Sequence, residues 1–166
     1  MSDLSNEENE ILLLHTKGNW NEILDKFDRN KFLPWIWPSL ENLFFIQKYV
    51  RDQGSDSLIS VGCGSGLFEW LLIMATGLNV VGIELDGTCW TTKYFSGSFI
   101  PLHLVSENSK GYFPIKTDNS TLLFCYFNNL NAFLNYMHNF NGNSLIRNFY
   151  VQLSNECFLT KVVGNT

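Results

Sequence analysis

The sequence predicts an α/β fold: a doubly wound, mostly parallel sheet with a Rossmann-like arrangement of strands and helices. Three observations carry this prediction. Short apolar runs alternate with helical segments from Leu58 onward, which is typical of β and α units around a parallel sheet. A glycine-rich turn joins the first apolar run to the next helical segment. The chain has 166 residues, 45% of them apolar, which is enough for the core of one domain.

Residues 1–50 are expected to form a helical extension and a connector, and residues 51–166 the Rossmann-like domain, within a single folding unit. Pro34 and Pro38 restrict the residues before them and mark the connector as extended. Ser39 is expected to cap the helix that follows. The first predicted helix begins at a capping box formed by Ser5 and Glu8, extends through Leu14 and is stopped by Gly18. Two further helices are predicted in this part of the chain, from Asn21 to Asp28 and from Leu40 to about Arg51.

The remaining elements follow from the alternation of apolar and helical stretches. Near the C-terminus, every second residue is apolar or β-branched in two stretches, 149–153 and 158–162, which indicates a hairpin that turns at 154–156. The end of the sheet is therefore expected to be abbreviated. Strands are expected at about 57–61, 79–84, 100–105, 121–126 and 143–146, and helices at about 66–75, 88–95 and 130–139.

Charge and composition exclude several classes of partner. The formal net charge is −5, the sequence pI is about 5.1, and no run of Lys and Arg is present, which disfavours a nucleic-acid backbone as the main partner. The first ten residues are acidic, and no apolar run approaches the ~20 residues of a membrane span. The four cysteines and three histidines are scattered, so no metal site is expected. These features predict a soluble, cytoplasmic protein without a membrane anchor.

The glycine-rich turn carries the strongest functional signal. Gly62, Gly64 and Gly66 separate the first apolar run from an amphipathic stretch, and glycine permits positive φ and the close approach of a ligand. Amides in such a turn, together with a helix N-terminus, suit an anionic or carboxylate-bearing ligand. Glu84 lies at the end of the next strand, where a carboxylate can accept both hydroxyls of a ribose. Together these residues predict a site for a nucleoside-bearing small molecule.

The run V-G-C-G-S-G resembles motif I of the class I S-adenosylmethionine-dependent methyltransferases, and V-V-G-I-E-L-D resembles their second-strand acidic motif. The resemblance covers residues 40–146, and its specific part is Ile59–Asp86. It implies S-adenosylmethionine as the cofactor and a mostly parallel sheet closed by an antiparallel last strand. The implied cofactor contacts are Gly62, Cys63, Gly64, Ser65 and Gly66 with the methionine part, Glu84 with the ribose, and Leu85 and Asp86 beside the adenine.

The chain departs from the family pattern in two acidic positions. Many members carry Asp or Glu two residues before the first glycine, where this chain has Ser60, a weaker acceptor for an ammonium group. Glu69 can compensate in part if it reaches back toward the site, but an ordinary first-turn acid stabilised by the helix dipole is the favoured interpretation. Family members often place an acid against the adenine after the third strand, and the aligned stretch here is Ser106 and Glu107.

Further residues are candidates for lining the cofactor or substrate. The fourth strand leads into F-N-N, where amine-methylating family members often show Asp or Asn followed by Pro-Pro and an aromatic residue. Asn128 either contacts a substrate or caps the following helix. Trp35 and Trp37 either cover the site or pack in the core with Phe44, Phe45 and Tyr49, and core packing is favoured. The candidates are Tyr126, Phe127, Asn128, Asn129, Trp35 and Trp37.

The sequence therefore favours a methyltransferase whose acceptor, a small molecule or a protein, is not encoded in any recognisable motif. No histidine has local support as a general base. A nicotinamide-binding protein is disfavoured because Leu67 stands where the dinucleotide motif has its third glycine. A non-catalytic relative that binds a partner remains an alternative, because Ser60, the missing Pro-Pro motif and the unusual C-terminus depart from the pattern.

Overall fold

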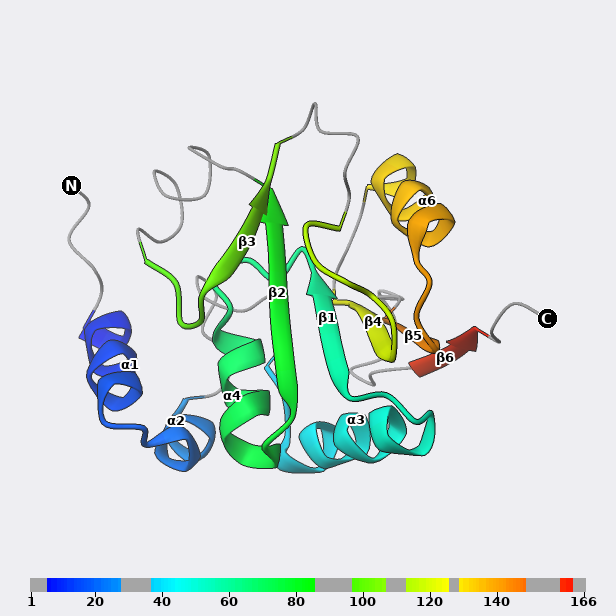
Figure 1. Ribbon diagram of the computed structural model, residues 1–166. Helices are drawn as coiled ribbons and strands as arrows, with labels where there is room; N and C mark the ends of the chain where they lie inside the picture. The colour runs from blue at the N-terminus through cyan, green and yellow to red at the C-terminus, as the bar shows by residue number, and fades with distance from the viewer. Residues whose placement is uncertain are drawn as a thin grey trace, which may run out of the picture.

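The sheet is the centre of the molecule, and its strands order the rest of the chain (Figure 1). A computed structural model describes residues 6–27, 37–85, 97–106, 113–125, 129–148 and 159–162. The strand order is β3-β2-β1-β4-β5-β6; the first five strands in the chain are parallel, and β6 is antiparallel to β5. The strands are β1 (Ser57–Val61), β2 (Asn79–Leu85), β3 (Leu102–Val105), β4 (Ser120–Phe124), β5 (Ser144–Asn148) and β6 (Leu159–Val162).

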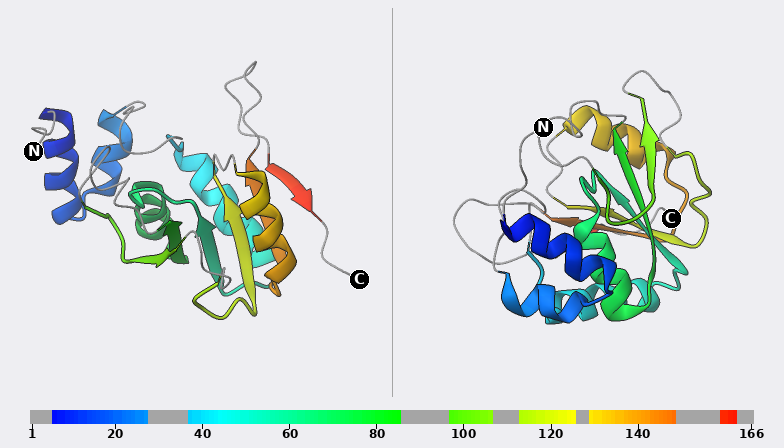
Figure 2. Two further views of the ribbon diagram at one scale, coloured as in Figure 1. Left: turned by 90° about the horizontal axis from the view of Figure 1, so that it is seen from above. Right: turned by 90° about the vertical axis from the view of Figure 1, so that its left-hand side faces the viewer.

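Helices cover both faces of the sheet, which confirms the predicted doubly wound α/β arrangement (Figure 2). Among the described helices, four pack against one face and α6 packs against the other. Successive residues of β1 serve the two faces in turn: Leu58 belongs to the first core cluster and Ile59 to the second. The helices are α1 (Asn6–Thr16), α2 (Trp20–Lys26), α3 (Leu40–Asp52), α4 (Leu67–Thr76) and, on the second face, α6 (Leu130–Asn139).

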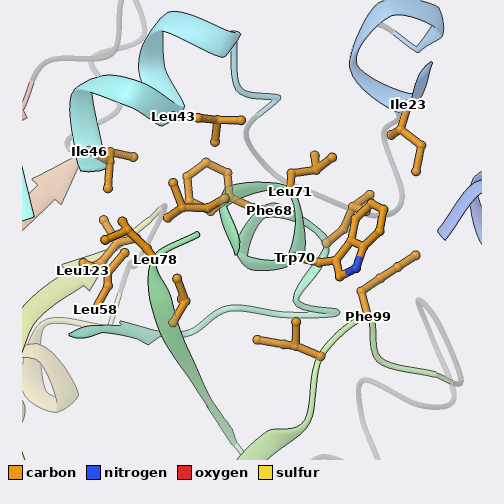
Figure 3. Packing of buried hydrophobic residues seen from close by; sticks show 14 of the residues in the cluster. Ile23, Leu43, Ile46, Leu58, Phe68, Trp70, Leu71, Leu78, Phe99 and Leu123 are labelled. Carbon is orange, nitrogen blue, oxygen red and sulfur yellow. The ribbon is translucent and has the colours of Figure 1, made fainter. Parts of the chain in front are cut away.

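Helix α4 forms the centre of the larger core. Six consecutive residues from Leu67 to Leu72 are buried, because α4 lies between the sheet and the other helices of its face. Figure 3 shows Phe68, Trp70 and Leu71 meeting side chains from α2 and α3. A helix buried on all sides tolerates few polar groups, so the glutamate within this stretch is unusual.

Local sequence signals fix where the helices begin and end. Ser39 Oγ accepts a hydrogen bond from Asn42 N, and Asn42 Oδ1 accepts one from Ser39 N, so the predicted cap of α3 is confirmed as a capping box. Gly18, the predicted stop after α1, has a φ of +72°.

The buried face of α3 differs from the expected one. Leu43, Ile46 and Val50 are buried, whereas Phe44 and Phe45 are about half exposed, at 46% and 50%. The aromatic pair was expected in the core, but the helix can turn only one stripe toward the sheet. The spacing of Leu43, Ile46 and Val50 selects that stripe.

The third strand begins two residues later than predicted. Phe99 and Ile100 are buried against α4, and Phe99 N donates to Ser65 O at 2.8 Å. These apolar residues pack over the glycine-rich turn rather than extend the strand. Consequently β3 starts only at Leu102, beyond Pro101.

The C-terminal strand pairs with a different partner from the one expected. Residues 149–153 were predicted to form the other arm of its hairpin, but β6 pairs with β5, with Asn148 opposite Leu159. The antiparallel strand thereby covers the edge that β5 would otherwise expose. The expected arm at 149–153 and the expected helix at 88–95 lie outside the described residues. Among the described helices, none has the length and apolar character to cross a membrane.

Candidate functional site

The glycine-rich turn, residues 62–66, joins β1 to α4 at the carboxyl edge of the sheet. β1 has β2 on one side and β4 on the other, so the chain order reverses at this strand. Ligands of open α/β sheets bind outside the carboxyl ends of the strands at such a reversal. The turn therefore lies where this architecture forms ligand sites.

The conformation of the turn explains its three glycines. Gly62, Gly64 and Gly66 have φ values of +75°, +60° and +78°, in the left-handed region that side chains disfavour by roughly 1–2 kcal/mol per residue. At Gly66 there is no room either, because a Cβ would lie 2.7 Å from Ile100 Cγ1. The turn thus requires glycine for conformation, and at Gly66 also for space.

Glu84 lies directly against this turn. Its Oε2 accepts a hydrogen bond from Gly64 N at 2.7 Å, and its Oε1 accepts one from Leu85 N at 2.8 Å. Burial raises the pKa of the Glu84 carboxyl, and the two backbone amides oppose that rise. The structure therefore brings together the two parts of the predicted site, Gly64 and Glu84, through a direct contact.

Hydrogen bonds within the chain already engage most amides of the turn. Gly62 N and Cys63 N point to Ile83 O, at 2.8 and 3.5 Å, and Gly66 N donates to Cys63 O at 3.0 Å. The sequence predicted that these amides are free to bind a ligand. In the structure, the amides of Gly62 and Cys63 instead hold the turn against the end of β2. Binding capacity at this edge lies instead in the carboxyl groups of Glu84 and Glu69.

Glu69 reaches back from the first turn of α4 to β1. Ser60 Oγ donates to Glu69 Oε1 at 2.6 Å, and both residues are buried, with exposed fractions of 0% and 1%. Within the described part of the chain, Glu69 Oε2 has no hydrogen-bond partner. Burial raises the pKa of Glu69 to about 7, and the charge of Glu84 adds to the rise, while the Ser60 hydroxyl and the Glu69 amide oppose it.

Cys63 completes the group of titratable side chains around the turn. Its Sγ donates to Ile83 O at 3.6 Å, and a Cβ added to Gly82 would come within 2.8 Å of this sulfur. Burial, then the negative charges of Glu69 and Glu84, raise its pKa well above the usual range. A thiolate is the reactive form of cysteine, so Cys63 packs against β2 as a thiol rather than acting as a nucleophile.

Two other predicted contacts with the cofactor have structural roles within the described chain. Ser65 is buried, and its carbonyl accepts from Phe99 N. Leu85 ends β2, is 41% exposed and donates its amide to Glu84.

The structure also places two of the lining candidates. Trp37 is half-buried and packs against the first core cluster, which is the core role that the sequence favoured. Asn129 Oδ1 accepts from Ala132 N at 3.0 Å, so Asn129 caps α6; the sequence had placed the alternative cap one residue earlier. The other candidates, Trp35, Asp86, Glu107, Tyr126, Phe127 and Asn128, lie outside the described residues.

Sequence reasoning missed the segment that covers the turn. His15 Nε2 lies 3.0 Å from Phe99 O, and the His15 ring meets the rings of Trp70 and Phe99 edge-on. Ile100, next in the chain, packs against Gly66. No local pattern signals contacts between residues 84 positions apart.

The sequence matches no protein-family model, and no curated protein is significantly similar to it. In the described part of the chain, no group of three or more His, Cys, Asp or Glu is arranged to bind a metal ion.

Proposed function

We propose that the chain binds S-adenosylmethionine and transfers its methyl group to an acceptor. The observation that carries this proposal is the Glu84 carboxylate, 2.7 Å from Gly64 N at the reversal point of the sheet. A carboxylate at the end of the second strand of such a sheet suits the hydroxyls of a ribose. The resemblance of the glycine motif to the methyltransferase family supports the choice of cofactor.

Glu84 retains the capacity for such a ligand. An ionised carboxylate has about four acceptor positions, and Glu84 uses two of them for Gly64 N and Leu85 N. The two amides fix the orientation of the carboxylate before a ligand arrives. The remaining positions suit two hydroxyl donors on adjacent carbons.

The charge of the site favours a cationic cofactor over a dinucleotide. In dinucleotide folds the pyrophosphate lies at the N-terminus of the first helix, where this chain places Glu69. Glu69 is buried at the start of this helix and accepts a hydrogen bond from Ser60 on β1, so its carboxyl group lies between the helix and the sheet. The carboxyl group of Glu69 at this helix start repels a pyrophosphate and attracts a sulfonium or an ammonium group.

The chemistry proposed here asks little acid–base work of the protein. Bound S-adenosylmethionine supplies an electrophilic methyl on a sulfonium, which a nucleophile displaces in line. The chain orients the nucleoside through Glu84 and excludes water with the apolar cover around Ile100. No residue of the described chain is assigned as a general base.

Thermal unfolding in the presence of candidate ligands tests the proposal. S-adenosylmethionine or S-adenosylhomocysteine at 100 times its dissociation constant should stabilise the chain by about 2.7 kcal/mol. That corresponds to a rise in Tm of roughly 5–10 °C for a chain of this size. Glu84→Gln should lose most of this rise, whereas Glu41→Gln, a matched change at an exposed acid on α3, should keep it.

The same assay separates the alternatives. A rise with reduced nicotinamide dinucleotide and none with the methionine nucleosides would assign the site to a dinucleotide. No rise with either ligand class would overturn the proposal and favour a non-catalytic partner-binding protein.

A further inference from the structure

The unpartnered oxygen of Glu69 is the strongest unexplained feature of the described chain. It is the one buried side-chain nitrogen or oxygen of the described residues without a hydrogen-bond partner. A buried carboxylate without full pairing is costly, and the rest of α4 from Leu67 to Leu72 is apolar. An ordinary first-turn acid favoured by the helix dipole would be exposed and solvated; Glu69 is 1% exposed.

The residues around Glu69 place this oxygen beside the proposed nucleoside site. Ser60 pairs with Gly82 in the β1–β2 register, and Glu84 follows Gly82 by two residues on the same face of the sheet. Glu69 is hydrogen-bonded to Ser60 and Glu84 to Gly64, so the two carboxyl groups lie at the two ends of the short segment that joins β1 to the turn. A ligand bound through Glu84 would therefore extend toward the Ser60–Glu69 pair.

We propose that Ser60 and Glu69 form a subsite for a primary ammonium group of the ligand, with Glu69 Oε2 as the main acceptor. The inference rests on the proposed function and adds to it a requirement for an amino group. Ser60 directs its proton to Glu69 Oε1, so its own lone pairs remain available as acceptors. An ammonium group has three donors and a full positive charge, which matches these two acceptors and compensates the buried carboxylate.

The arrangement gives Ser60 a role of its own. A serine in the strand cannot supply a charge, but it can fix the carboxylate that comes from the helix. The acid is thus supplied by α4 and positioned by β1. A metal ion fits less well, because the described residues offer no group of three ligands.

Ligand pairs that differ only in the amino group test this subsite. The probes are S-adenosylhomocysteine, its deaminated analogue, and 5′-methylthioadenosine, which lacks the whole amino-acid end. In the unaltered chain the deaminated analogue should bind 10- to 100-fold more weakly than S-adenosylhomocysteine. In Glu69→Gln the two should bind within about threefold of each other, and 5′-methylthioadenosine should bind both proteins equally.

Two further variants separate positioning from direct contact. Ser60→Ala should reduce the preference for the amino group only in part, because Glu69 keeps its charge but loses its fixed orientation. Glu84→Gln, the matched change at the buried acid of β2, should weaken all three probes by the same factor and leave the preference intact.

The outcomes distinguish the two proposals. If none of the three probes binds the unaltered chain, the proposed function fails and the subsite fails with it. If the probes bind but Glu69→Gln preserves the preference for the amino group, the nucleoside site stands and the ammonium subsite is overturned. Equal binding of the amino and deaminated probes by the unaltered chain would also overturn it.

Discussion

The two ends of the central strands use buried hydroxyl groups in opposite ways. At the amino end of the sheet, Thr121 Oγ1 forms hydrogen bonds with Ser55 Oγ at 2.9 Å and Ser144 Oγ at 2.8 Å. At the carboxyl end, the Ser60 hydroxyl meets the carboxyl of Glu69, whose second oxygen has no partner within the described chain. At the amino end, neutral hydroxyl groups form hydrogen bonds with one another. At the carboxyl end, an ionisable carboxyl group has a hydrogen-bond partner for one of its two oxygens.

The difference shows where this chain accepts a cost in stability. Neutral hydroxyls that satisfy one another can be buried cheaply, and they join the segment before β1 to β4 and β5. A buried carboxyl without full pairing destabilises the fold unless it is protonated or finds a cation. Within the described residues, the chain bears that cost at the edge where this kind of sheet binds ligands.

The largest expected difference between the two ends is the pH dependence of the unfolding free energy that Glu69 causes. Its pKa rises from 4.5 to about 7 on folding, so the folded state holds the proton more tightly. The stabilisation is fully present below pH 4.5 and is lost as the pH rises toward 7, with a total change of about 3 kcal/mol. Urea unfolding at intervals from pH 4.5 to 8 should show this decline in the unaltered chain.

Glu69→Gln is the matched variant for that measurement. It keeps the size of the side chain and removes its titration, so the difference in unfolding free energy between the two proteins should follow the Glu69 curve. Glu84, whose pKa shifts in the same direction, is present in both and cancels. A difference that stays constant with pH would contradict the shifted pKa of Glu69.

A change at the amino end should have an effect of intermediate size. Thr121→Val keeps the shape of the side chain but removes both hydrogen bonds of the Ser55–Thr121–Ser144 network. We expect a loss of about 2 kcal/mol in unfolding free energy, independent of pH between 5 and 8. Ligand affinity should be unchanged, and a large loss of affinity would contradict the separation of the two ends.

The smallest expected effect concerns Ser60. Ser60→Ala removes the hydrogen bond that stabilises ionised Glu69, at a cost of about 1 kcal/mol above pH 7. The pKa of Glu69 should rise further, because the Ser60 hydroxyl lowers it in the unaltered chain. The pH curve of unfolding should therefore shift to higher pH, and a shift to lower pH would contradict the assigned direction of the hydrogen bond.

Much of the fold could be predicted because its elements have local causes. The predicted strand at 57–61 and helix at 130–139 coincide with β1 and α6, since apolar runs and periodicity determine them. The antiparallel strand at the sheet edge, implied by the family resemblance, is also present as β6. Ile100 was predicted to begin the third strand because it is apolar and β-branched, but it is buried over the turn and lies before β3.

The candidate site could be predicted in outline but not in its bonding. Spacing placed Gly64 and Glu84 at one edge, and the structure joins them by a hydrogen bond. The Ser60–Glu69 contact depends on how three left-handed glycines direct the start of α4 back onto β1, which no local rule specifies. One signal was available: Glu69 is the sole charged residue in the helix L-F-E-W-L-L-I-M-A-T.

The contact between His15 and Phe99 connects α1 to the carboxyl edge of the sheet. Ile100 lies against Gly66, and the preceding residue is bound through its carbonyl to His15 on α1. A displacement of Ile100 away from Gly66 would therefore also strain or break the hydrogen bond between His15 and Phe99 O. A helix that begins 56 positions upstream of Gly62, at Asn6, thus holds the segment that covers the glycine turn.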